Sequence, residues 1–192
     1  MNLLFFIFAQ SSGMTLAILP FGNVSKAIID STVSGISSLY DVEITVLECV
    51  PLPVNEYYKP NKRYRAEKIL YYLESNVDTK YAKVLGLTTK DISTTKEQYH
   101  DWGIFGLGTL NGRVCVISTY RLRRKKASDS LFYARLKKVV NHELGHVFGL
   151  EHCPNDRCLM EDACGKIKTV DEETGALCPE CASKVRNFLK QR

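Results

Sequence analysis

Apolar and polar positions along the first half of the chain alternate between strand-like and helix-like patterns. An apolar run at residues 15–20 is typical of a buried strand, and residues 42–50 alternate as a half-buried strand does. Between them, residues 24–39 predict a helix that Asn23 or Ser25 could cap. Prolines then predict a loop over residues 51–60. A second helix is predicted beyond it, with an apolar face formed by Ala66, Ile69, Leu70 and Leu73.

The second half predicts a third strand, a hairpin and a long helix. Residues 82–87 are typical of a buried strand, and a loop is expected around Trp102. Residues 104–110 and 113–120 flank the pair Asn111-Gly112, which supplies the two positive φ angles of a tight hairpin turn. A helix is predicted from Asp129 to Phe148, and after it regular structure is expected only in a short helix over residues 182–190. This order of elements indicates a mixed α/β sheet.

The composition agrees with a folded domain in a reducing compartment. The 192 residues suit one domain, and 45% of them are hydrophobic. The net charge of +5 is mild and does not require a nucleic-acid partner. Five of the seven cysteines crowd into residues 153–181, and such spacing indicates metal binding more than a disulfide framework. We therefore expect a cytoplasmic protein.

The N-terminus carries a short apolar run at residues 3–9, without a preceding Lys or Arg. It is poor as a signal peptide and too short to cross a bilayer, which takes about 20 residues. We expect residues 1–13 to be an extension, with a start at Met14, a genuine signal or an anchor as alternatives. Residues 14–192 then form one domain, divided into subdomains 14–149 and 150–192.

The long predicted helix carries two histidines one turn apart. His142 and His146 lie only about 40° apart around a helix, so both can bind one metal ion. Glu143 lies off that axis and can reach a metal-bound water without binding the metal. A left-handed Gly149 would end the helix and return His152 to the ion. Three imidazoles leave a position for water, as in catalytic zinc sites, so Glu143 is expected to act as a general base.

Four cysteines form two close pairs, Cys153 with Cys158 and Cys178 with Cys181. The 19 residues between the pairs match the spacing of a structural zinc site with four thiolates. Such a site would tie the C-terminal part to the end of the long helix. Cys164 is left over from these pairs; it could substitute for one ligand, but its spacing from a partner cysteine is poorer. Ordinary packing is the other explanation for Cys164, and the explanation for Cys49 and Cys115.

Five of the six residues at 121–126 are basic. Because no aromatic residues are interleaved with them, a solvated loop is favoured over a nucleic-acid contact. We expect no nucleic-acid or membrane partner, and a monomer.

The segment from His142 to Cys181 resembles the archaemetzincin family, because it matches the family motif HExxHxxGxxHCx4CxMx17CxxC at every fixed position. The resemblance implies a metzincin-like zincin fold of the α/β (α+β) class, with a twisted mixed sheet, an active-site helix and a small zinc-stabilised C-terminal part. It implies two zinc ions, a catalytic one at the three histidines and a structural one at the four paired cysteines. Met160 matches the motif methionine, which implies a Met-turn beneath the catalytic metal; core packing explains it equally simply.

The expected function is that of a zinc-dependent metallopeptidase acting on a peptide or protein. The alternative is a catalytically weak or inactive peptide-binding protein on the same fold, against which Glu143 argues. By analogy with metzincins, residues 104–110 are the edge strand along which a peptide binds. Trp102 and Phe105 either line that cleft or belong to the core.

Overall fold

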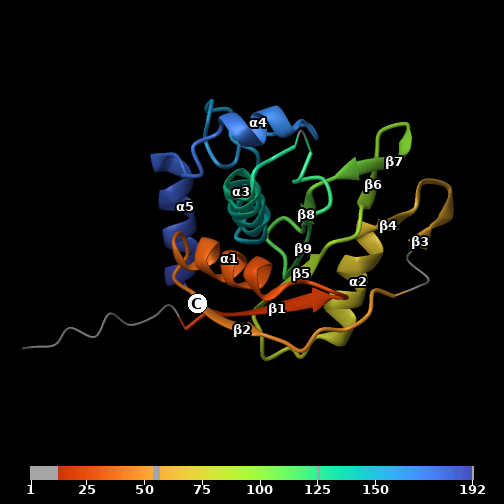
Figure 1. Ribbon diagram of the computed structural model, residues 1–192. Coiled ribbons are helices and arrows are strands. Elements are labelled where there is room, and N and C mark those ends of the chain that lie inside the picture. The colour runs from red at the N-terminus through yellow and green to blue at the C-terminus, as the bar shows by residue number, and fades with distance from the viewer. Residues whose placement is uncertain (1–12, 54–56, 125, 192) are drawn as a thin grey trace, which may run out of the picture.

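The computed structural model describes residues 13–53, 57–124 and 126–191, so the expected N-terminal extension lies outside the described residues up to residue 12. A five-stranded sheet forms the centre of the molecule, in the order β2-β1-β5-β9-β8 (Figure 1). Four of its strands run parallel: β1 (Thr15–Phe21), β2 (Glu43–Val46), β5 (Lys83–Thr88) and β9 (Val114–Ser118). The edge strand β8 (Gly106–Gly108) pairs antiparallel with β9. The predicted mixed α/β class is confirmed.

Helices cover both faces of this sheet (Figure 1). On one side α1 (Lys26–Ser37) and α3 (Asp129–Val147) pack with α4 (Ile167–Glu172) and α5 (Pro179–Lys190). On the other side lies α2 (Ala66–Asn76). Strand β1 shows how one sequence serves both layers: Leu16 and Ile18 join the first core, and Ala17 and Leu19 join the second. Neighbouring side chains of a strand point to opposite faces, which accounts for this division.

The turn between β8 and β9 differs from its predicted form. The two strands pair as expected, but φ is positive at Asn111 (+51°) and not at Gly112, so the prediction of two positive φ angles is wrong. The Gly112 N–H donates to the carbonyl of Thr109 at 3.0 Å, and the Asn111 N–H donates to the carbonyl of His146 at 2.8 Å. The turn therefore takes its shape from docking on α3, a contact that local turn chemistry does not include.

A second sheet contains the segment around Trp102, for which the sequence predicts a loop. Its strands, in spatial order, are β3 (Tyr57–Tyr58), β4 (Arg63–Arg65), β6 (Ile92–Lys96) and β7 (Tyr99–Ile104), with a short 3-10 turn at Lys59–Asn61. The loop prediction is wrong because β6 and β7 are largely polar and pair antiparallel without an apolar stripe.

Ion pairs centred on Asp91 connect this second sheet to the segment that follows β9. The Asp91 carboxylate accepts from Arg121 Nε at 2.6 Å and from Arg63 Nε at 2.9 Å. Arg121 is only 7% exposed, so the prediction of a solvated loop is wrong for the first residue of the basic run. Arg123 pairs with Asp129 at 2.9 Å on the surface. Lys125 lies outside the described residues.

One hydrophobic core joins the two predicted subdomains. Met160, Val170 and Val185 belong to the same cluster as Leu144 of α3. Helix α4 lies where no regular structure is predicted, and α5 begins at Pro179, ahead of the predicted residue 182. The division at residue 149 stays a prediction. Among the described residues, no helix has both the length and the apolar character that crossing a bilayer requires.

Candidate active site

Helix α3 presents its functional face because its other side is fixed to α1. The Ser128 side chain caps the helix by accepting from the Leu131 N–H at 3.2 Å. Tyr40 donates its hydroxyl to the carbonyl of Asn141 at 2.6 Å, and Asn141 donates its side-chain amide to Gly35 at 3.0 Å. These bonds fix the rotation of the helix, so that His142, Glu143 and His146 face the cleft described below.

The end of α3 turns the chain back toward the cleft. Gly149 has φ +87°, the predicted left-handed conformation. The Leu150 N–H donates to the carbonyl of Gly145 and the Gly149 N–H to that of His146, the bonding pattern of a Schellman helix end. The buried ammonium of Lys83 binds the carbonyl of Val147 at 3.1 Å, where the helix dipole favours a cation. Sequence patterns did not identify this lysine, because it lies in an apolar strand.

The three predicted histidines meet at one point. One ring nitrogen of each of His142, His146 and His152 lies within 4.8 Å of the others. The Nδ1 atoms of His142 and His146 lie 2.7 Å from the carbonyls of Leu159 and Leu150, so both Nδ1 atoms carry the proton. Their Nε2 lone pairs then face each other across 3.1 Å. Two nitrogens on a tetrahedral zinc ion lie about 3.3 Å apart, so this set fits zinc.

Burial changes the acid–base properties of this face. Burial, assisted by the neighbouring His146, lowers the pKa of His142 to about 4, and burial also lowers the pKa of His146. Both imidazoles are therefore neutral near pH 7, as metal ligands must be. Burial raises the pKa of Glu143 to about 8, although a hydrogen bond from the backbone of Gly108 opposes the rise.

Glu143 lies between α3 and the edge strand β8. Its side chain is buried, and the residue is 8% exposed. A β-carbon at Gly106 would lie 2.6 Å from Glu143 Cγ, and one at Gly108 would lie 2.6 Å from the Glu143 carbonyl oxygen. Two glycines therefore let β8 approach the helix closely enough to cover the carboxylate.

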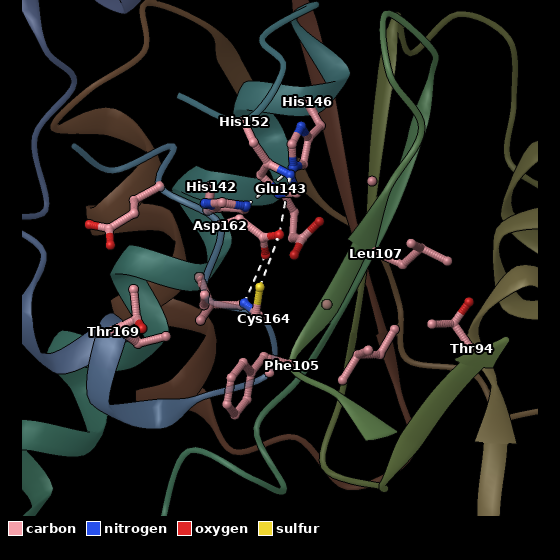
Figure 2. Close-up of a pocket in the computed structure, with 18 of the residues that line it drawn as sticks. Thr94, Phe105, Leu107, His142, Glu143, His146, His152, Asp162, Cys164 and Thr169 are labelled. Carbon is pink, nitrogen blue, oxygen red and sulfur yellow. Dashed lines mark hydrogen bonds and ion pairs between the residues drawn. The ribbon is translucent and has the colours of Figure 1, made fainter. Parts of the chain in front are cut away.

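A cleft of about 540 Å³ opens in front of these residues (Figure 2). Strand β8 borders one side of it, and β6, β7 and the loop at residues 161–165 contribute to its walls. Trp102 lines the cleft and belongs to neither core cluster. Phe105 lines the cleft and is also part of the core, at 8% exposure. Trp102 is therefore a cleft residue outside the core, whereas Phe105 belongs to both the cleft and the core.

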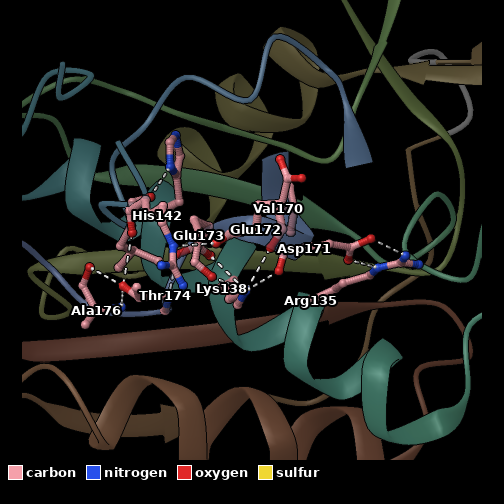
Figure 3. Close-up of polar contacts among 12 residues, drawn as sticks. Arg135, Lys138, His142, Val170, Asp171, Glu172, Glu173, Thr174 and Ala176 are labelled. Carbon is pink, nitrogen blue, oxygen red and sulfur yellow. Dashed lines mark hydrogen bonds and ion pairs between the residues drawn. The ribbon is translucent and has the colours of Figure 1, made fainter. Parts of the chain in front are cut away.

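Helix α4 forms another wall and is attached to α3 by two cations (Figure 3). Arg135 is 1% exposed and forms a bidentate ion pair with Asp171: Nε lies 2.6 Å from Oδ1, and Nη2 lies 2.8 Å from Oδ2. Lys138 donates to the carbonyls at the end of α4, with 2.9 Å to Val170 and 2.5 Å to Glu173. The cleft wall is therefore rigidly joined to the helix that carries the histidines.

The four paired cysteines also meet, with all sulfur atoms within 4.8 Å of one another. Sulfur atoms on a tetrahedral zinc ion lie about 3.8 Å apart, and Cys153 Sγ lies 3.8 Å from Cys178 Sγ. The backbone N–H of Cys181 and the amide of Asn155 lower the pKa of Cys178 to about 6. Burial raises the pKa of Cys158 and Cys181. The set fits zinc, because a cation would stabilise all four thiolates.

Four further sulfur residues, Met160, Cys115, Cys49 and Cys164, are not among the four clustered thiols. Met160 is fully buried under α3, and its Sδ lies 2.4 Å from where a β-carbon of Gly145 would be. Cys115 is buried in β9, as packing predicts. Cys49 and Cys164 are exposed, so packing is the wrong explanation for both. Cys164 lines the cleft, and Asp162, which the sequence did not single out, lies beside it (Figure 2).

The profile of a family described as "Peptidase family M54" matches residues 18–187. This chain belongs to peptidase family M54. The family assignment confirms the resemblance to archaemetzincins and, at the level of the class, the prediction of a zinc metallopeptidase.

Several relatives within family M54 are similar over nearly their whole length. The archaemetzincin of Natronomonas pharaonis is 33% identical over 179 residues, 90% of this chain and 99% of the relative. The crystal structure of archaemetzincin from Methanopyrus kandleri is 28% identical and superposes with a TM-score of 0.81, covering 96% of this chain and 99% of that one. The archaemetzincin structure from Archaeoglobus fulgidus, complexed with malonate, gives 29% identity and a TM-score of 0.76 over 89% and 99%. These structures also confirm the fold class.

Proposed function

We propose that this protein is a metzincin-type peptidase in which His142, His146 and His152 hold the catalytic zinc and Glu143 is the general base. The observation that carries the proposal is the meeting of three imidazoles beside a buried carboxylate in the 540 Å³ cleft. A zinc ion held there supplies Lewis acidity, which makes water more acidic and polarises a carbonyl group.

Glu143 transfers the proton in this reaction. Burial raises the pKa of Glu143 to about 8, and its ionised form is the reactive one: that carboxylate takes a proton from water as the water oxygen bonds to the carbonyl carbon of the peptide. The carbon–nitrogen bond then breaks, and the same carboxyl group donates the proton to the departing amine. Because Glu143 is 8% exposed under β8, the proton is kept within the site and away from bulk water.

The substrate in this proposal is an extended peptide. Strand β8 pairs with β9 along one edge, and its residues Gly106 to Gly108 line the cleft along the other. A peptide can add to such an edge through backbone hydrogen bonds, with its side chains in flanking pockets.

A second zinc at the four paired cysteines is part of the proposal, with a structural role. The sulfur–sulfur distance of 3.8 Å supports it, and so does the position of Cys153 directly after His152. None of the seven cysteines forms a disulfide, which supports the proposal that the protein works in the reducing cytoplasm. A monomer without nucleic-acid or membrane partners stays a prediction.

The test is cleavage of a peptide library by the zinc-loaded protein, with zinc content measured for each variant. We expect Glu143→Ala to lower the rate by at least about 10²–10⁴-fold while zinc stays bound. Glu151→Ala is the matched control, because Glu151 is an exposed acid that lines the same cleft. Undiminished cleavage by Glu143→Ala would exclude its role as base. Binding of peptides by the native protein without cleavage would favour the inactive peptide-binding alternative.

A further inference from the structure

The three histidines differ in what lies beside the Nδ1 atom of each ring. Leu159 and Leu150 place backbone carbonyls 2.7 Å from Nδ1 of His142 and His146. His152 lies beyond the helix, and its side chain is 49% exposed. A carboxylate oxygen, Oδ2 of Asp162, lies 3.9 Å from its Nδ1. The exposed ring therefore faces a charged acceptor, whereas the two half-buried rings face neutral ones.

Asp162 is itself held in place. Its Oδ1 accepts the backbone N–H of Cys164 at 2.8 Å, and its Oδ2 accepts the Cys164 thiol at 3.2 Å (Figure 2). Two residues earlier, the carbonyl of Met160 accepts the N–H of Cys153 at 2.8 Å. The segment with the acid is thus bonded to the segment with the histidine, and the acid does not depend on the histidine for its position.

We propose that Asp162 is the positioning residue for His152: its carboxylate accepts the Nδ1 proton and so fixes the tautomer and the direction of the ring. The proposal rests on the proposed function, because it takes His152 to be a zinc ligand. At 3.9 Å, a small rotation of the exposed ring or one bridging water completes the hydrogen bond.

The chemistry of the pair explains why an acid stands at this position. A half-exposed imidazole has little packing to hold it, so its Nδ1 partner determines where Nε2 points. A carboxylate partner also makes the imidazole a better electron donor to a metal. In addition, it places a negative charge near a site whose three ligands are neutral, which favours a dication.

The competing explanation is that Asp162 only shapes its own loop through the two bonds to Cys164. The two explanations differ for Asp162→Asn, which keeps the size of the side chain and an oxygen for the Cys164 N–H but removes the charge. Asp162→Ala removes both, and Asp162→Glu restores the charge on a longer chain. Glu172→Gln is the matched control, since it removes one acid from the exposed face of α4, where Glu172 pairs with Lys168 at 3.5 Å.

The experiment loads each full-length variant with Co²⁺ and removes the metal with increasing chelator. Only cysteine ligands give a thiolate-to-cobalt absorption band, so metal lost without loss of that band comes from the histidines. We expect Asp162→Asn and Asp162→Ala to weaken metal binding at the histidines about 10- to 100-fold. The thiolate band and the melting temperature should stay as in Glu172→Gln, and Asp162→Glu should recover part of the affinity.

Two results would overturn the proposal. One is an Asp162→Asn protein that holds the histidine-bound metal as tightly as Glu172→Gln does. The other is an affinity loss that Asp162→Glu does not reduce at all, which points to loop structure. A native protein that binds cobalt at its cysteines and none at its histidines would instead overturn the proposed function.

Discussion

The carboxylate of Glu143 lies directly against the backbone of Gly106, where a β-carbon would be 2.8 Å from Oε1. A methyl group at this position must therefore displace the acid or push β8 away from α3. We predict that Gly106→Ala lowers kcat by about 10²–10⁴-fold, the contribution of a positioned general base. Zinc content should be unchanged, because the three atoms nearest to the added β-carbon all belong to Glu143. Steady-state kinetics with metal analysis measures both quantities.

The double variant with Glu143→Gln identifies the cause of that loss. If Gly106→Ala acts only by moving Glu143, the double variant is no slower than Glu143→Gln alone. Multiplied effects of the two changes would show that Gly106 acts on the peptide and not on the acid.

The sequence was sufficient for the features that depend on local spacing. Two histidines four residues apart must share a helix face, and Gly149 must take a positive φ to end that helix, so the histidine cluster followed from neighbours along the chain. The parallel strands β1 and β5 were equally predictable, because both are continuous apolar runs.

Features that depend on distant partners were missed. Strands β6 and β7 are largely polar; they pair with each other, and Asp91 beside β6 also binds Arg121, 30 residues away. The ammonium of Lys83 was hidden for the same reason, since its acceptor at Val147 is 64 residues away. Asp162 falls at a variable position of the histidine–cysteine motif, so the motif did not single it out, and only the fold shows that it lies beside His152.

An ion pair between buried Arg135 and partly exposed Asp171 holds the wall of the cleft. Arg135 also donates to the buried carbonyl of Leu122 at 2.7 Å, so Arg135→Ala leaves that carbonyl without this donor. We predict a loss of about 2 kcal/mol in the free energy of unfolding, the cost of a buried acceptor left without its partner. Lys168→Ala, which breaks an exposed pair on the same helix, should cost about 0.5 kcal/mol or less. Urea denaturation of both variants measures the difference, and equal losses would contradict it.

The two metal sites should differ in what their loss does to the protein. Cys181→Ser removes a ligand that is buried in the core between α5 and α3, so zinc content should fall from two to one and the melting temperature should drop sharply. His152→Ala removes an exposed ligand, so zinc also falls to one, activity is lost, and the melting temperature changes much less. Metal analysis and calorimetry check both; similar melting temperatures for the two variants would refute the structural role of the cysteines.

Trp102, the single tryptophan of the chain, lines the cleft and therefore reports its occupancy. Its ring lies 5.5 Å from that of Tyr99, and a β-carbon at Gly165 would lie 3.3 Å from its Nε1. We predict that a peptide added to the Glu143→Ala variant shifts the emission of Trp102 in a saturable way, because binding removes water from the ring. The control is a variant that combines Trp102→Phe with Tyr71→Trp, which moves the tryptophan to α2. Tyr71 is 75% exposed, and α2 lies on the opposite face of the sheet from α3. An emission change of equal size in that control would show that the signal does not come from the cleft.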